Sequence, residues 1–557
     1  MHSRGLTLVL AGALAAAMLV GVSASRGAGT QSPPDVHEFA AKILNSPAAR
    51  FLSPGAHAAL EMAAHGNNQF GQGNNTTIPY KTRKAAGGNG PKQSSFKNAI
   101  VNDPQMDTNP PYAPNQLDQT TQSETSIAVC GNNVVTGFND SQQTLLFLTP
   151  GSNLSGYSVS TNKGQAWNDQ ATIPNRPGDI NLGDPWLAAD SACNFYYSTL
   201  YIDFDVDRFA LDIGVAKSTD GGKTFSPPVM VDTQAAADPF YFGDKDSLAA
   251  GPGVGGNGNA LYDSWDDFVF KFDPCCSFLS GLPVSHSYDG GQTWVVTYAD
   301  QVPIFGDGCS FQQFIGANPF VTKNGTVFDA VERLFVNNPD CEFNPPPPFQ
   351  REIDIYRSDD GGQTWGPRSV VSDVTESTPG GLFFLGPHKW MRNLEFPTTA
   401  QFGNSLYVAW NDGRSGHSHI MLARSDDGGA TWATTPVADG IENDEIQPAM
   451  VGDSNGLHIL YYVRNPDLTL DTYIDNSPAG TPTFTPQRVS TQSFPGVYTV
   501  PQFDPIIVFG YMGDYIGMAT DGKNQYMAWG DNRDRITSFL YPQGRNDPDV
   551  FSAVQAP

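Results

Sequence analysis

An aromatic residue, one variable residue and an aspartate recur in that order along the chain. Carboxylates in such a series can hold sugar hydroxyls, bind a cation or transfer a proton. Two further segments carry arginine at the matching position, so carboxylates and guanidinium groups would share one rim. The aspartate copies are Phe138-Asn139-Asp140, Tyr201-Ile202-Asp203, Trp265-Asp266-Asp267, Trp410-Asn411-Asp412 and Trp529-Gly530-Asp531, and the arginine copies are Val331-Glu332-Arg333 and Tyr462-Val463-Arg464.

These recurring aspartates also have a structural interpretation, because a feature present in most repeats usually serves the repeat itself. Asp412 and Asp531 are each followed two residues later by an arginine, which can close a local ion pair. Both interpretations stay open. More polar residues precede the next strand-like runs, namely Glu124, Asp184, Asp244, Asp246, Glu395, Asp444, Glu445 and Asp514. The candidate ligand-binding residues are Arg333, Arg464, Asp267, Trp410, Arg414 and Arg533.

A second motif indicates which elements position these residues. It has the pattern Ser-x-Asp-Gly-Gly-x-Thr-aromatic, in which the aspartate can accept hydrogen bonds from turn N–H groups and the glycines supply positive φ. The threonine and the aromatic residue then begin a strand, which makes the motif a hairpin turn. Four close copies span 218–225, 287–294, 358–365 and 425–432; a looser one, at 160–167, has Asn162 in place of the aspartate. A sixth, degenerate copy runs over 475–484.

This pattern resembles the Asp box, or bacterial neuraminidase repeat, of sialidase-like β-propellers. The resemblance covers residues 96–557 and is specific for the fold rather than for the function. It implies that the Asp boxes are scaffold and lie on the face opposite the ligand-binding funnel. Four strand-like runs surround each box, which is the composition of one propeller blade. In the fifth repeat these are 398–401, 406–410, 420–424 and, after the box, a fourth run.

We therefore predict an all-β fold, a β-propeller with seven blades of four strands each. Six blades, the number usual in sialidases, is the alternative. The last repeat has three strands of its own, ending with 549–554, and the segment 96–103 resembles the missing fourth. Pairing these two ends would close the ring and remove two open sheet edges.

The sialidase resemblance also implies three arginines for the sialic acid carboxylate, a Tyr–Glu nucleophile pair and an aspartate as acid and base. The first arginine normally lies in an Arg-Ile-Pro motif, which this chain lacks. Tyr511 or Tyr515 with Glu332 or Glu395 would form the nucleophile pair. A neutral-glycan hydrolase would instead need two carboxylates across the funnel. The catalytic candidates are thus Glu332, Glu395, Asp412, Asp531, Tyr511 and Tyr515.

The charge and the N-terminus limit the location and the partners. A formal net charge of −26 repels phosphate backbones, so nucleic acid is not expected as a partner. Residues 1–24 read as a signal peptide and 25–95 as a flexible segment with short helices, followed by the propeller at 96–557. We expect a monomer that is secreted or periplasmic and has no membrane span after signal cleavage.

All six cysteines follow the signal, which indicates disulfides in an exported chain. Cys130 and Cys193 follow the innermost strands of consecutive repeats, so we predict that they pair. Cys275, Cys276, Cys309 and Cys341 would form two further bonds of unassigned connectivity. We expect no cofactor and no zinc site, although a structural cation is compatible with the acidic rim. The predicted function is recognition of extracellular glycans through the funnel face, with glycosidic hydrolysis as a further step; the alternative is a non-catalytic propeller that binds protein partners.

Overall fold

The structure is a computed structural model of the chain. It describes residues 36–45, 94–104, 121–141, 151–202, 209–232, 240–271, 277–304, 309–338, 349–378, 381–387, 389–478, 483–497, 512–536 and 543–557, with short pieces at 49, 52–53, 56–57, 59–60, 64, 340 and 480–481. The predicted signal peptide lies outside the described residues. No helix in the described part is long and apolar enough to cross a membrane.

The described chain is nearly all β, as predicted, and most of its strands form antiparallel meanders. Three of the meanders have four strands each in chain order. They consist of β2 (Gln122–Cys130), β3 (Asn133–Asp140), β4 (Ser155–Ser160) and β5 (Asn168–Thr172); β15 (Phe311–Val321), β16 (Val327–Val336), β17 (Gln350–Ser358) and β18 (Ser369–Val374); and β21 (Thr398–Phe402), β22 (Ser405–Asp412), β23 (His419–Ser425) and β24 (Ala433–Pro436).

Two larger sheets and two small hairpins vary this pattern. A nine-stranded sheet joins two meanders through a parallel pairing of β9 with β11. It contains β6 (Ile180–Asn181), β7 (Trp186–Ala189), β8 (Phe195–Ile202), β9 (Phe209–Ser218), β10 (Val229–Met230), β11 (Phe240–Gly253), β12 (Asn257–Lys271), β13 (Ser277–Ser287) and β14 (Val295–Pro303). A five-stranded sheet contains β25 (Asp444–Gly452), β26 (Leu457–Arg464), β27 (Thr469–Ser477), β28 (Thr485–Arg488) and β29 (Phe494–Pro495). The hairpins are β19 (Leu382–Phe384) with β20 (Trp390–Arg392), and β32 (Arg535–Ile536) with β33 (Arg545–Asn546).

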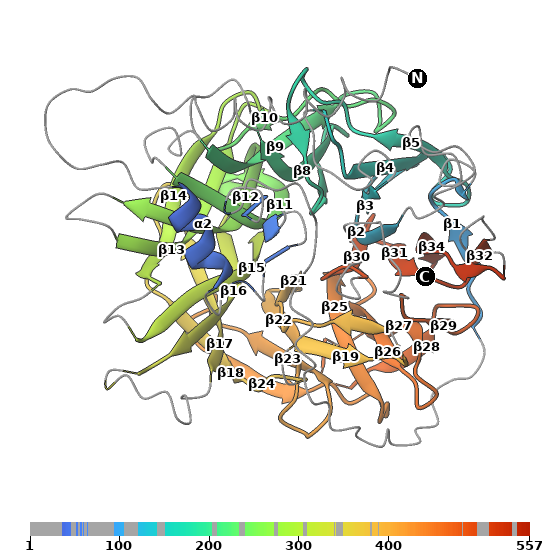
Figure 1. Cartoon of the computed structure of the whole chain (residues 1–557). Helices are drawn as coiled ribbons and strands as arrows, with labels where there is room; N and C mark the ends of the chain where they lie inside the picture. Colours follow the sequence, from blue (N-terminus) through green and yellow to red (C-terminus); the bar gives the residue numbers. More distant parts are fainter. Residues whose placement is uncertain are drawn as a thin grey trace, which may run out of the picture.

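The two ends of the chain share one sheet. It is built in the order β1 (Ala99–Ile100), β34 (Asp549–Gln555), β31 (Gln525–Asp531) and β30 (Gly517–Thr520). Ala99 stands opposite Ser552, and the N–H of Val101 donates to the carbonyl of Val550 at 2.8 Å. The predicted pairing of the terminal segments is therefore present, with β1 beside β34 in Figure 1.

The sheets follow one another in sequence order around a common centre (Figure 1). The innermost strands β2, β7, β11, β15, β21, β25 and β30 each contact the next, and β30 contacts β2. Second strands such as β22 and β26 are buried along their whole length because neighbouring sheets cover both of their faces. Trp265, Trp410 and Trp529 fill these interfaces and are fully buried.

The hairpin turns between third and fourth strands have the predicted hydrogen bonds. In one copy Asp289 Oδ1 accepts from the N–H groups of Gln292 and Thr293, each at 2.9 Å. The Thr293 hydroxyl donates to Asp289 Oδ2 at 2.6 Å, and Ser287 Oγ accepts from Gly291 N at 2.9 Å. The turns around Asp220, Asp360 and Asp427 are built in the same way. These aspartates therefore stabilise turns.

Cys130 and Cys193 form the predicted disulfide, with their Cα atoms 5.4 Å apart. It ties the turn between β2 and β3 to the turn between β7 and β8. Cys309 is also disulfide-bonded, whereas Cys275, Cys276 and Cys341 lie outside the described residues.

Part of the predicted N-terminal segment packs on the sheets. Helix α2 (Val36–Leu44) places Ala40 and Ile43 in the same buried cluster as Phe242 of β11 and Phe311 of β15. Residues 52, 53, 56, 59 and 60 are also buried. The structure thus adds a contact that composition alone did not reveal.

Candidate functional site

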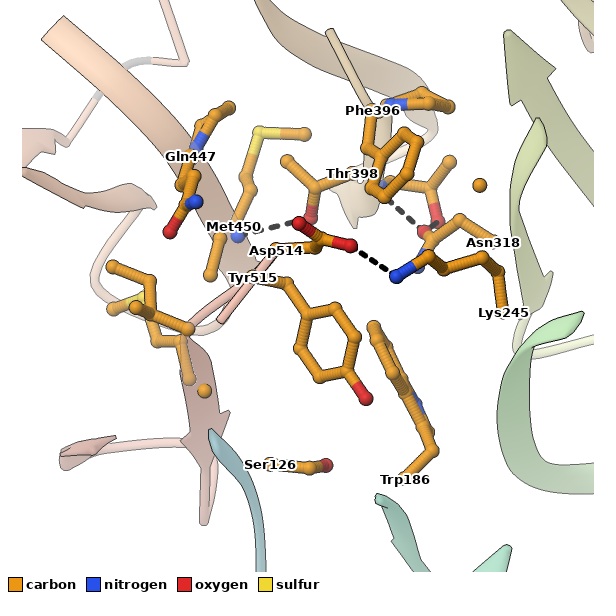
Figure 2. A pocket seen from close by; sticks show the side chains of 18 of the residues that line it. Ser126, Trp186, Lys245, Asn318, Phe396, Thr398, Gln447, Met450, Asp514 and Tyr515 are labelled. Atoms are coloured by element: carbon orange, nitrogen blue, oxygen red, sulfur yellow. Dashed lines mark hydrogen bonds and ion pairs between the residues drawn. The ribbon is translucent and has the colours of Figure 1, made fainter. Parts of the chain in front are cut away.

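A channel with a volume of about 190 Å³ lies where the innermost strands meet. Its lining residues come from every sheet that contributes an innermost strand. Figure 2 shows the side chains of 18 of them. The lining segments are Thr125–Ile127, Trp186 with Leu187, Lys245 with Asp246, Gly316–Phe320, Leu394 with Phe396–Thr399, Gln447–Met450, and Asp514–Met518.

A buried cluster of charged side chains adjoins this channel, and two of its members, Lys245 and Asp514, line the channel wall. Lys245 Nζ pairs with Asp514, and it lies 3.7 Å from Asp184 Oδ2 and 3.8 Å from Glu124 Oε1. Arg392 Nε donates to Asp514 Oδ1 at 2.6 Å. We call Lys245, Asp514, Asp184, Glu124 and Arg392 the mouth cluster.

Irregular backbone at the start of the innermost strands aims these side chains at the centre. The antiparallel register of β2 shifts between Ser123 and Ser126, and that of β11 shifts between Asp244 and Ser247. Within these bulges Glu124 has φ 52° and Lys245 has φ 57°, and Asp184, just before β7, has φ 54°. Non-glycine residues pay a steric cost at positive φ, and bulges re-aim side chains. The recurrence of this costly backbone at the channel marks it as a candidate site.

The mouth cluster holds two carboxyl groups whose pKa values are shifted in opposite directions. Burial, with the neighbouring Glu124 carboxylate, raises the pKa of Asp184 well above its usual range. Burial acts the same way on Asp514, but Arg392 and Lys245 overcome it and lower the pKa of that carboxyl. Neither carboxylate oxygen of Asp184 accepts a hydrogen bond from the described residues. Environments that push the pKa values of two carboxyl groups apart are a feature of acid–base pairs.

Aromatic rings line the channel next to this cluster. Trp186 and Tyr515 lie side by side, with ring centroids 5.0 Å apart (Figure 2). Lys245 Nζ lies 5.9 Å from the centroid of the Phe396 ring. Tyr515, a predicted nucleophile, donates from its hydroxyl to the carbonyl of Pro185 at 3.0 Å. Because burial and then the Glu124 carboxylate raise the pKa of Tyr515, its phenol stays protonated.

Glu332 and Glu395 were the two candidate glutamates for the predicted Tyr–Glu nucleophile pair. They lie together, but at a different place from the mouth cluster. Arg351 Nη1 lies 2.9 Å from Glu332 Oε1 and also pairs with Glu395. Glu376 pairs with the other nitrogen, Nη2, at 2.8 Å. All but Glu376 are buried. Burial raises the pKa of Glu395 to about 8 even though Arg351 opposes the shift.

The rim aspartates are engaged with neighbours in their own sheets. Trp410 Nε1 donates to Asp412 Oδ2 at 3.2 Å, and Arg414 binds both oxygens of the same carboxylate. Trp529, Asp531 and Arg533 repeat the arrangement, with Trp529 Nε1 at 3.0 Å from Asp531 Oδ2. Both aspartates are fully buried. This geometry favours the structural interpretation of the aromatic-x-Asp motif.

The remaining candidate residues also pair with neighbours of their own rather than with one another. Asp267 accepts from the Tyr298 hydroxyl at 2.5 Å. Arg333 pairs with Glu352 at 3.3 Å, and Arg464 pairs with Asp444 at 2.8 Å. Tyr511 lies outside the described residues.

The mouth cluster contains two residues that sequence reasoning missed, Lys245 and Arg392. Glu124, Asp184 and Asp514 were noticed only as polar residues that precede strands. Lys245 had one available signal, a basic residue between two aspartates in Asp244-Lys245-Asp246, whereas Arg392 had none. No group of three or more histidine, cysteine, aspartate or glutamate residues in the described part is arranged to hold a metal ion.

Comparisons with known proteins give only distant likenesses. No protein-family model matches the sequence, and no curated protein does. Among solved structures, the chain is similar to the alpha-L-arabinofuranosidase of Fusarium graminearum, with 11% identity over 83% of this chain and 98% of that chain and a TM-score of 0.41. The sialidase of Trypanosoma rangeli shares 12% identity over 84% of this chain and 60% of that chain, with a TM-score of 0.36. The endosialidase of phage phi92 shares 10% identity over 83% and 69%, with a TM-score of 0.41. TM-scores this low carry no argument about activity.

Proposed function

We propose that the protein is a secreted, seven-bladed Asp-box propeller that recognises extracellular glycans at the mouth of its channel. The observation that carries the proposal is the mouth cluster, in which Lys245 and Arg392 stand among Asp514, Asp184 and Glu124 beside an aromatic-walled channel. Sugars offer hydroxyls that both donate and accept hydrogen bonds, together with apolar faces that stack on rings. The mouth cluster supplies partners for both features.

The seven-bladed ring is part of this proposal. It is supported by the cyclic contacts of the innermost strands from β2 through β30 and by the pairing of β1 with β34. A ring closed in this way brings one residue from each blade to the axis, so that charges far apart in sequence converge.

Neutral glycans fit the mouth cluster better than sialylated ones. Arg392 is the one arginine that pairs with the cluster in the described part of the chain. A ligand carboxylate would also meet Asp514 and Glu124 and the overall charge of −26. Hydrolysis is the second candidate function, favoured by the opposite directions in which the pKa values of Asp184 and Asp514 are shifted.

The test is binding and sugar release by the purified mature protein, with a panel of neutral β-glucans and sialylated glycans. Asp184→Asn keeps the shape of the side chain and should weaken glycan binding by at least about tenfold, or about 1.4 kcal/mol. Asp263→Asn is the matched control, because Asp263 is an equally buried carboxyl that contacts Ser198 rather than the mouth cluster. No binding and no release by a folded protein would reject the glycan proposal. Binding without release would reject hydrolysis alone.

A further inference from the structure

The mouth cluster is in contact with the N-terminal part of the same chain. The carbonyl of Leu52 accepts a hydrogen bond from Arg392 Nη1 at 2.5 Å. The N–H of the next residue, Ser53, donates to Asp244 Oδ2 at 2.8 Å. Asp244 directly precedes Lys245 in β11, and Arg392 belongs to the mouth cluster, so both contacts lie at this cluster.

Apolar packing holds this part of the chain in place. Leu52, Ala56, Ala59 and Leu60 are buried in the cluster that also contains Phe242. Ser53 Oγ accepts from the N–H of Ala56 at 3.1 Å, which orders the turn that follows the two polar contacts. We call Leu52, Ser53, Ala56, Ala59 and Leu60 the N-terminal plug.

The plug offers the mouth cluster one hydrogen-bond acceptor and one hydrogen-bond donor. A sugar hydroxyl combines both in a single group. The Leu52 carbonyl acts as an acceptor for a guanidinium, and the Ser53 N–H acts as a donor to a carboxylate. A hydroxyl oxygen and its proton can replace these groups one for one. The plug and a glycan would therefore need the same atoms of Arg392 and Asp244.

We propose that the N-terminal plug is a built-in competitor that closes the glycan site until it is displaced. The inference rests on the glycan-binding function proposed above and adds its regulation. Because the plug belongs to the same chain, it competes at a high effective concentration. The measured affinity for glycan is then the intrinsic affinity of the open site multiplied by the fraction of molecules whose plug has left.

The experiment places a charge in the plug of the full mature chain. Ala59→Glu and Ala56→Glu each put a carboxylate into a fully buried position and should expel the plug. Ala430→Glu, at an exposed turn residue, is the matched control. Phenylglyoxal modification of Arg392, followed by peptide mass spectrometry, reports whether the mouth is uncovered. Arg414, whose side chain is 38% exposed, is the internal reference.

Both plug variants should raise the modification rate of Arg392 at least about tenfold, and they should tighten glycan binding by a similar factor, because the closed fraction no longer competes. The control should change neither quantity. An unchanged Arg392 rate overturns the inference, and so does an uncovered Arg392 with unchanged glycan affinity. An uncovered Arg392 with no glycan binding at all rejects the glycan function instead and leaves the covering contact standing.

Hydrogen exchange of the wild-type chain keeps the test decisive if both variants fail to fold. Saturating glycan should speed the exchange of the Ser53 amide, whose partner Asp244 lies outside the plug. Exchange that is unchanged or slowed by bound glycan overturns the inference.

Discussion

The guanidinium of Arg392 binds both oxygens of Asp514: Nε lies 2.6 Å from Oδ1, and Nη2 pairs with Oδ2. Arg392 ends β20, and Asp514 precedes β30, 122 positions further along the chain. Their contact connects the end of the β19–β20 hairpin with the segment that leads into β30. Because Lys245 pairs with the same carboxylate, two cations depend on one buried anion.

Asp514→Asn should therefore destabilise the fold strongly. It leaves Lys245 and Arg392 near one another without their common partner, and breaking a buried ion pair costs about 3–5 kcal/mol. Chemical denaturation measures the loss. Asp359→Asn is the control, because Asp359 pairs with Arg357 on the surface and its side chain is 64% exposed. If Asp514→Asn costs no more than this control, the mouth cluster does not stabilise the ring.

Stability should fall as the pH rises from about 4 to about 8. Burial raises the pKa of Asp263 to about 8 and that of Asp329 to about 7. In the unfolded chain an aspartate titrates near 3.9, so the folded state keeps these protons through that window. Their contribution to the free energy of unfolding is complete below pH 4. It is lost progressively as the pH rises to the folded pKa values, by roughly 1.4 kcal/mol per group and pH unit.

Asp263→Asn and Asp329→Asn should flatten this decline in denaturation curves collected at a series of pH values. Asp220→Asn is the contrasting control. Slight burial opposes ionisation of Asp220, but hydrogen bonds from Thr224 outweigh it and lower the pKa. Asp220→Asn therefore removes stability that is present above about pH 4, and it changes the slope of the pH profile only at acidic pH. A pH profile that is identical for Asp263→Asn and the wild type would show that the buried carboxyl does not keep its proton.

The rim motif should matter for folding rather than for ligand binding. Trp410→Phe removes the indole N–H that donates a hydrogen bond to Asp412, while it keeps a buried ring. The change should lower the free energy of unfolding by about 1–3 kcal/mol, since it leaves a smaller ring and a lost hydrogen bond. Glycan affinity, measured by calorimetry, should stay within twofold. A selective loss of binding without loss of stability would restore Trp410 as a ligand contact.

Asn102 should be necessary for the pairing of the chain ends. Its side chain accepts from Val550 N at 2.9 Å and donates to Asp549 Oδ1 at 2.8 Å. Asn102→Ala leaves both buried groups unpaired and should cost about 1–3 kcal/mol. Gln165→Ala, at an exposed turn position, should cost little. Hydrogen exchange would also show faster exchange in β34 of the Asn102 variant, and equal exchange would contradict the prediction.

Loss of the Cys130–Cys193 disulfide should lower the melting temperature. The two cysteines are 63 residues apart, and the bond limits the unfolded chain accordingly. Cys130→Ala with Cys193→Ala should cost about 2–4 kcal/mol. Calorimetry of the double variant beside each single variant gives the comparison. A double variant as stable as the wild type would mean that the native fold constrains these turns without the bond.

The hairpin turns and the strand runs could be predicted from sequence because each depends on short-range chemistry. The Cys130–Cys193 disulfide could be predicted because its cysteines occupy matching places in consecutive repeats. The hydrogen bonds of Asp289 and Thr293 arise within one turn, so the motif carries its own geometry. Even the pairing of 96–103 with 549–554 follows from the strand that the last repeat lacks. The aromatic-x-Asp motif was visible too, but its sequence left open whether Asp412 faces a ligand or Arg414.

Only the tertiary structure decided where charge converges. Lys245 lies in β11, Arg392 in β20 and Asp514 before β30, and their contacts depend on how these segments are placed around the centre rather than on any local pattern. The same holds for the contact of Leu52 with Arg392, which joins residues 340 positions apart. The sequence alone therefore determined the repeats and their turns, whose interactions are local. The mouth cluster and its plug depend on packing between distant segments, which no single repeat encodes.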